Sequence, residues 1–68
     1  MMKINLLKAH MALKGKSINE IVDLLGISKS TIYRKLKGKS EFTRKEMLLL
    51  INFLNIGNEE AANIFFDD

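Results

Sequence analysis

The sequence predicts an all-α protein, a single compact domain of about five helices over residues 1–68. Three observations predict this fold class. The chain contains no proline, so no pyrrolidine ring interrupts a helix from within. Apolar residues recur every three or four positions, and no long stretch alternates apolar and polar side chains. Serine, threonine and glycine separate the apolar stretches, where helices are expected to begin and end.

The first helix is predicted over about 2–13, and Gly15 ends it. Its apolar face is expected to contain Ile4, Leu7 and Met11. The second helix is predicted to begin after Ser17, because Ser17 and Glu20 have the spacing of a capping box.

Gly26 supplies the left-handed residue that ends the second helix, whose buried face is expected to contain Ile21, Leu24 and Leu25. The third helix is predicted over 28–37, with Ser28 as its cap. Ile32 and Leu36 form its inner face, and Gly38 ends it. Residues 17–37 therefore form a helix–turn–helix.

Thr43 and Glu46 form a second capping box that begins a fourth helix. Phe42, just before this cap, is placed to pack against Met47. Between residues 47 and 54 the only polar side chain is Asn52. This is more apolar surface than one face of a small monomer should bury.

A last short helix is predicted to begin at a cap on Asn58. Its apolar residues are expected to be Ala61, Ala62, Ile64 and Phe65.

Charge is distributed unevenly along the chain. Residues 1–28 carry four lysines and two acids, residues 29–45 seven bases and one acid, and residues 46–68 five acids and no base. A basic segment of this kind is typical of a surface that binds a polyanion. A lysine-rich face that contacts only solvent is the alternative interpretation.

The third helix carries a polar, basic stripe opposite Ile32 and Leu36. Its members are spaced i, i+3, i+4, i+7 from Ser30, and Lys29 lies beside them at the amino end. Arginine can form a bidentate pair with guanine O6 and N7, and the other side chains suit other base edges or thymine methyl groups. The predicted base-contacting residues are Lys29, Ser30, Tyr33 and Arg34.

Polar residues around this stripe are suited to the DNA backbone, which positions a protein without reading sequence. The amino end of the second helix adds N–H groups that favour a phosphate. Capping alone explains Ser17 and Ser28, and solvation alone explains Lys35, so the prediction depends on the whole arrangement. The predicted phosphate-contacting residues are Ser17, Ser28, Lys35, Lys37, Lys39 and Ser40.

Residues 17–39, continuing to Phe42 and Thr43, resemble the helix–turn–helix of the lambda-repressor-like family, which includes phage repressors, Cro proteins and small XRE-type bacterial regulators. The matching pieces are the Ser17 cap with Glu20, the turn Leu25-Gly26-Ile27-Ser28, the run Ser-Thr-Ile-Tyr-Arg and the exit Lys37-Gly38-Lys39. With the flanking helices, the resemblance covers nearly the whole chain.

The resemblance implies a five-helix domain that docks its third helix in the major groove, often as a dimer on a partly palindromic site. It places Lys29, Ser30 and Arg34 where relatives commonly contact bases. It places the loop 37–39 where relatives hold phosphates.

Two of the departures from this family concern the third helix. Many relatives pair an arginine late in the first helix with a glutamate near the end of the third, where this chain has Met11 and Leu36. A hydrophobic contact is expected in place of that ion pair. Lys35 occupies a position that is often aliphatic and buried in relatives.

No catalytic arrangement is visible, such as a nucleophile beside its base, a phosphate-binding glycine loop or a carboxylate pair. We expect no enzymatic activity, no cofactor and no small-molecule ligand. With no cysteine and His10 as the one histidine, no metal site is expected. The apolar run 47–51 is far shorter than the about 20 residues of a membrane span, and no leader is recognised. We therefore expect a cytoplasmic protein without a membrane partner.

The predicted function is sequence-specific binding of double-stranded DNA by a transcriptional regulator of Cro or repressor type, of phage or prophage origin. A homodimer would place two reading helices about 34 Å apart. The alternatives are a protein-interaction module, such as an antirepressor or antitoxin-like partner of another regulator, and a binder of RNA or single strands, for which Tyr33 alone offers a stacking ring. The apolar surface expected to form the dimer contains Leu48, Leu49, Phe53, Ile56, Phe65 and Phe66.

Overall fold

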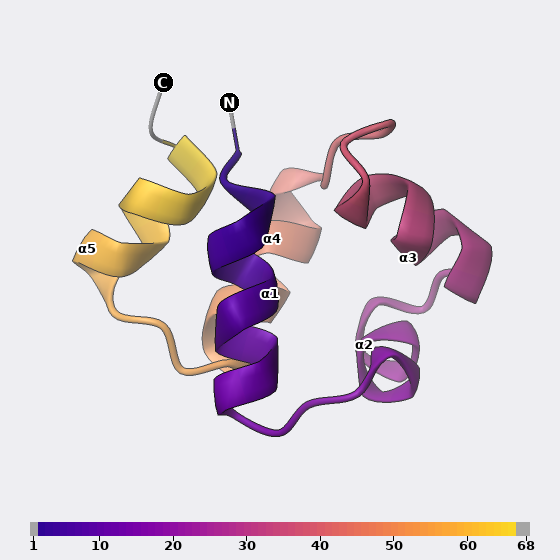
Figure 1. The fold of residues 1–68 in the computed structure, drawn as a ribbon, viewed down its shortest axis with the longest axis horizontal. Helices are drawn as coiled ribbons and strands as arrows, with labels where there is room; N and C mark the ends of the chain where they lie inside the picture. Colours follow the sequence, from indigo (N-terminus) through magenta and orange to yellow (C-terminus); the bar gives the residue numbers. More distant parts are fainter. Residues whose placement is uncertain (1, 67–68) are drawn as a thin grey trace.

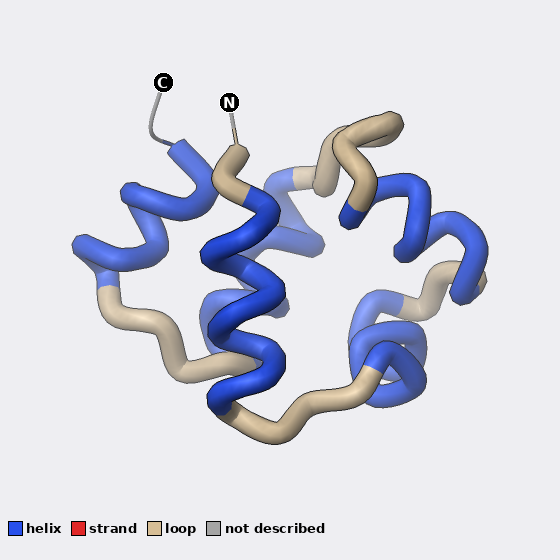
Figure 2. The backbone as a smooth tube through the Cα atoms, in the orientation of Figure 1, coloured by secondary structure: helices blue, strands red, loops and turns tan. Residues whose placement is uncertain are grey.

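The computed structural model describes residues 2–66, and these residues form helices joined by short loops, without a strand among them (Figures 1 and 2). The all-α prediction is confirmed. The elements in chain order are α1 (Ile4–Leu13), α2 (Ile18–Leu25), α3 (Lys29–Leu36), α4 (Arg44–Phe53), α5 (Asn58–Ala61) and a π-helical turn that continues α5, η1 (Ala62–Phe66).

The helices surround a central α1. In Figure 1, α2 and α3 lie on one side of α1, α5 and η1 lie on the other, and α4 lies behind it. The second and third helices pack against each other, and α4 packs against α2. The helix–turn–helix therefore forms one side of the molecule, and α4 packs behind its first helix.

Both predicted capping boxes are confirmed. Ser17 Oγ accepts a hydrogen bond from Glu20 N–H at 3.2 Å, and Ser17 N–H donates to Glu20 Oε1 at 3.2 Å. Thr43 and Glu46 repeat this arrangement at the start of α4, with distances of 3.1 and 2.8 Å. Such side chains satisfy amides that the first turn of a helix leaves without a partner.

Two predictions about helix starts are wrong. The first helix begins at Ile4 rather than near Met2, because Lys3 has a non-helical backbone (φ −91°, ψ 84°) and takes the cap position; its N–H donates to the Ile64 carbonyl at 2.8 Å and joins this segment to η1. Asn58 is not a cap: it is the first residue of α5, and Gly57 takes the cap position with an extended backbone and no side chain to accept a bond.

Left-handed residues end the helices. Gly15, Gly38 and Asn55 follow α1, α3 and α4 with positive φ, and Gly26 closes α2 in the same conformation. The three glycine positions were predicted, whereas Asn55 was not. Asparagine adopts this conformation more readily than other side-chain-bearing residues do.

The core lies where α1–α4 meet α5 and η1. Ile32 and Leu36 both belong to it, as predicted for the inner face of α3, and so do Met11 and Phe42. Its buried members are Leu7, Met11, Ile21, Ile32, Leu36, Phe42, Leu50, Leu54, Ile56, Ala61, Ile64 and Phe65.

Two residues of the expected dimer surface are in fact core residues. Ile56 and Phe65 are 6 % and 7 % exposed, because the chain turns back after α4 and places α5 and η1 against α1. Among the helices of residues 2–66, none is long and apolar enough to cross a membrane.

Candidate nucleic-acid interface

The outer face of α3 consists of polar and basic side chains that contact solvent. Ser30 and Arg34 are exposed, and Tyr33 is 43 % exposed. On the opposite face, Ile32 is fully buried and Leu36 is 6 % exposed. Apolar contacts therefore hold one side of α3 and leave the polar side accessible to a ligand.

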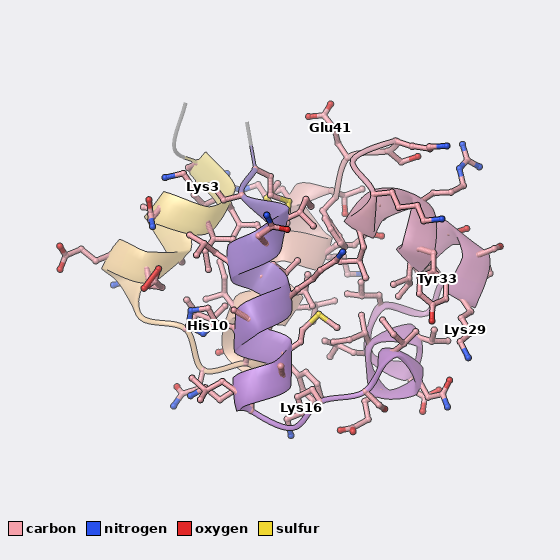
Figure 3. The ribbon with its side chains drawn as sticks, viewed as in Figure 1. Lys3, His10, Lys16, Lys29, Tyr33 and Glu41 are labelled. Atoms are coloured by element: carbon pink, nitrogen blue, oxygen red, sulfur yellow. The ribbon has the colours of Figure 1, made fainter. Side chains whose placement is uncertain are left out.

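Lys29 and Tyr33 extend from α3 on the side of the molecule away from His10 (Figure 3). Lys29 is the first residue of α3 and is exposed, one helical turn before Tyr33. The four residues predicted to contact bases thus share one accessible surface. Whether they contact bases stays a prediction.

Hydroxyl groups at the start of α3 bond to one another. Ser28 Oγ accepts from Thr31 N–H at 3.2 Å and lies 2.7 Å from Thr31 Oγ1 and 3.3 Å from Ser30 Oγ. A serine hydroxyl has one donor and two acceptor sites. Because Ser28 uses three contacts within the chain, Ser30 has more capacity than Ser28 to bind a ligand.

Ser17 is in a similar position at the start of α2. Its hydroxyl accepts from Glu20 N–H and lies 3.3 Å from Glu20 Oε1, so a carboxylate already occupies the end of the helix where a phosphate would bind. The prediction that Ser17 contacts phosphate is untested, and this negative charge counts against it.

The loop between α3 and α4 begins with a compact turn. Gly38 has φ +77°, and its N–H donates to the Lys35 carbonyl at 3.1 Å, while Lys39 N–H donates to the Arg34 carbonyl at 2.9 Å. These bonds satisfy carbonyl groups at the end of α3. Lys37 and Lys39 flank the glycine and are exposed, whereas Ser40 is half-buried.

Lys35 does not belong to this accessible surface, which counts against its prediction as a phosphate contact. The residue is 8 % exposed. Its Nζ lies 2.7 Å from Glu46 Oε1 and donates to the Glu41 carbonyl at 3.0 Å. Residue 35 follows Ile32 by three positions and therefore lies on the inner face of α3, where its ammonium group contacts Glu46 and the Glu41 carbonyl.

Glu46 receives hydrogen bonds from two directions. Burial alone would raise its pKa, but the hydrogen bond from Lys35, the bond from Thr43 N–H and the attraction of the Lys35 charge together lower the pKa below its ordinary value. Glu46 is therefore a carboxylate at neutral pH, and an ion pair between buried Lys35 and Glu46 joins α3 to the first turn of α4.

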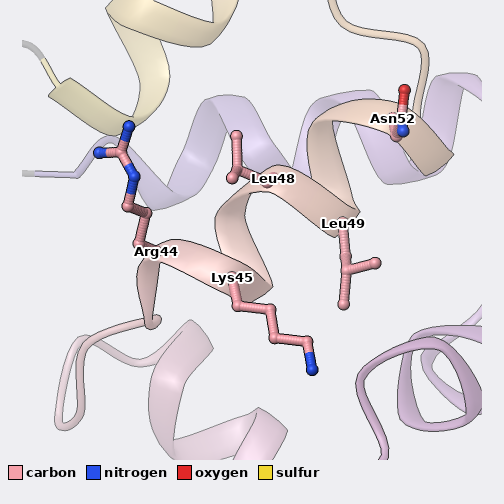
Figure 4. Close-up of a pocket in the computed structure, with 5 residues that line it drawn as sticks. All are labelled: Arg44, Lys45, Leu48, Leu49 and Asn52. Carbon is pink, nitrogen blue, oxygen red and sulfur yellow. The ribbon is translucent and has the colours of Figure 1, made fainter.

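The first turn of α4 adds two exposed cations, Arg44 and Lys45, which lie beyond the residues assigned to DNA from sequence. Figure 4 shows them with Leu48, Leu49 and Asn52 around a shallow hollow on the outer side of α4. Leu48 is 53 % exposed. The basic segment 29–45, which includes both cations, was the available signal in the sequence.

His10 is half-buried on α1, and its Nδ1 is buried without a hydrogen-bond partner among residues 2–66. Within the same residues, no group of three or more histidine, cysteine, aspartate or glutamate side chains is placed to hold a metal ion.

These features define a helix–turn–helix DNA-binding domain. Residues 3–39 match the family model described as the helix-turn-helix domain of resolvase, a match that covers α1, α2 and α3 and more than half of the 68 residues. The chain belongs to this family. The match establishes the helix–turn–helix class and does not distinguish the lambda-repressor-like group within it. No curated protein and no solved structure matches the chain significantly.

Proposed function

We propose that this protein is a sequence-specific regulator of transcription that inserts α3 into the major groove of double-stranded DNA. One observation carries the proposal: α3 is buried through Ile32 and Leu36 and exposes Ser30, Tyr33 and Arg34 on its other face. The major groove admits an α-helix, and these side chains can donate to and accept from base edges.

The cations around α3 support the same orientation. Lys37 and Lys39 are exposed in the loop that follows the reading helix, and Lys29 is exposed at its start. Cations at both ends of a helix can contact phosphates on the two sides of the groove, which fixes the helix in register without reading sequence.

The more specific form of the proposal is a regulator of Cro or repressor type, of phage or prophage origin. Such a protein acts in the cytoplasm, where bacterial DNA lies, and regulates by occupying an operator in competition with RNA polymerase. This form is supported by the resemblance of residues 17–43 to that family.

A homodimer on a partly palindromic operator is part of this proposal. Ile56 and Phe65 are core residues and do not contribute to a dimer interface. The apolar residues that remain for this interface are Leu48, Leu49, the half-buried Phe53 and Phe66. Leu48 and Phe66 are 53 % and 52 % exposed. Sedimentation tests it: we expect a dimer at high micromolar concentration or on DNA, and a monomer under both conditions would contradict it.

The same exposed surface on α4 favours the second candidate, a module that binds another regulator. In that case the helix–turn–helix would persist while its affinity for DNA was low. The two candidates therefore predict opposite results with DNA alone.

The deciding experiment is titration of the protein into labelled random duplex DNA over a series of salt concentrations. A protein that makes about six phosphate contacts should give a log–log slope near −5. Selection from a random duplex library then tests sequence preference and returns the site. No binding even in dilute buffer would overturn the proposed function and favour the protein-interaction module.

A further inference from the structure

We infer that the buried Lys35–Glu46 ion pair holds the basic loop between α3 and α4 in its phosphate-binding shape. Lys35 is then a positioning residue for DNA binding that does not contact DNA. The inference rests on the proposed function, because it concerns the same interface.

One ammonium group contacts both sides of this loop. Lys35 lies on the last turn of α3, and its Nζ is bonded to Glu46 Oε1 on the first turn of α4 at 2.7 Å. The same Nζ donates to the Glu41 carbonyl inside the loop at 3.0 Å and lies 5.5 Å from the centre of the Phe42 ring. Lys35 therefore fixes the position of residues 41 and 42 relative to both helices.

The exposed lysines depend on this attachment. Lys37 and Lys39 stand between the end of α3 and Glu41, so their backbone is held by the helix end on one side and by the Lys35 bond on the other. A phosphate contact has a required distance and direction, because charge-assisted hydrogen bonds are short and directed. If Glu41 is released, the lysines keep their charge but lose their fixed position.

Stability alone does not account for this pair. Apolar residues that replace a buried ion pair are often neutral or stabilising, so a lysine and a glutamate at these positions are not needed to hold α3 against α4. What an apolar pair lacks is a donor for the Glu41 carbonyl. The directed bond to the loop is the property that this lysine adds.

The test combines Lys35→Met with Glu46→Gln in the full chain. The net charge of the protein is unchanged, and glutamine can keep the capping box with Thr43. The matched control combines Lys8→Met with Glu59→Gln, two exposed positions outside the interface, and also leaves the net charge unchanged. Circular dichroism checks that each variant is folded.

Binding of random duplex DNA is measured over a salt series for the wild type and both variants. We expect the control to match the wild type. The Lys35→Met/Glu46→Gln variant should bind about tenfold more weakly at moderate salt, with a slope less steep by about one to two, as for the loss of one or two phosphate contacts. A folded variant with the affinity and slope of the wild type would overturn the inference.

A second comparison removes only the carboxylate charge, in single variants that circular dichroism shows to be folded. Glu46→Gln alone removes the ion pair, leaves Lys35 a neutral hydrogen-bond acceptor and keeps the cap, and Glu59→Gln alone makes the same change in net charge. The first variant should bind duplex DNA about threefold more weakly than the second, and equal affinities would overturn the inference.

Failure of the proposed function gives a different result. In that case the wild type itself does not bind duplex DNA. The positioning role is then read from amide hydrogen exchange, which should be faster at residues 39–42 in the Glu46→Gln variant than in the Glu59→Gln variant. Equal exchange would overturn the inference without reference to DNA.

Discussion

The Lys35 ammonium lies 2.7 Å from the Glu46 carboxylate, and the two side chains are 10 % and 11 % exposed. Each charge is largely removed from water and depends on the other, so removing one of them alone leaves the other buried without its partner. The pair joins the end of the reading helix to the start of α4. Its removal is therefore expected to have very different effects depending on whether one or both charges are removed.

Lys35→Met alone is expected to destabilise the protein by about 3 kcal/mol, because Glu46 is left as an uncompensated buried charge. The combination with Glu46→Gln is expected to restore the free energy of unfolding to within about 1 kcal/mol of the wild type. Urea denaturation followed by circular dichroism measures both values. Equal free energies for the single and double variants would show that the charges are not coupled.

Low pH should reduce the free energy of unfolding through protonation of Glu46. The folded state lowers its pKa, so the unfolded state takes up the proton at a higher pH than the folded state does. The stabilising contribution is complete above the unfolded value of about 4.3 and is lost as the pH falls toward the folded value. Below about pH 5, the free energy of unfolding should fall more steeply for the wild type than for Glu46→Gln. Glu59→Gln serves as the exposed control and should keep the wild-type slope.

Two cations near α3 should affect DNA binding in different ways. Arg34→Ala removes a side chain that can bind guanine bidentately and should cost about 1–3 kcal/mol on the preferred site while flattening preference at one position. Lys39→Ala should weaken all sequences about equally and reduce the salt slope by about one. Competition titrations with single-base variants of the selected site separate the two effects. If both variants bind the selected site as the wild type does, α3 has a different orientation on DNA.

Gly38→Ala tests the turn that follows α3. Gly38 has φ +77°, and an added Cβ would meet no atom within 4 Å, so the expected effect is purely conformational. Left-handed backbone costs about 1–2 kcal/mol for a residue with a side chain, and we expect a destabilisation of that size. Gly57→Ala is the control, since its Cβ also meets nothing but its φ is −67°. If thermal unfolding shows the same loss of stability for both variants, a side chain at position 38 does not strain this turn.

The two capping boxes were the most predictable part of this fold. Ser17 and Thr43, each followed by a glutamate three residues later, specify a local hydrogen-bond pattern that needs no tertiary contact, and the structure contains both capping boxes. Asn58 was misassigned as a cap because asparagine is favoured there, while the neighbouring Gly57 can take the same backbone conformation.

Tertiary contacts decided the remaining features. The accessible stripe on α3 follows from the helical period, so its members could be predicted from sequence. Lys35 was assigned to the surface because lysine is rarely buried without a partner, and that partner, Glu46, lies eleven positions away on another helix. Likewise, the positions of Ile56 and Phe65 depend on how the chain folds back after α4, which no local pattern specifies.

The hydrophobic interior is completed late along the chain. Ile64 is fully buried and Phe65 is 7 % exposed. Both belong to η1, which packs against α1 although the two elements are far apart in the sequence (Figure 1). A ribosome makes α1 before η1, so the part of α1 that η1 covers stays exposed until residue 65 has emerged. We therefore expect the hydrophobic interior to be complete only after η1 has been synthesised.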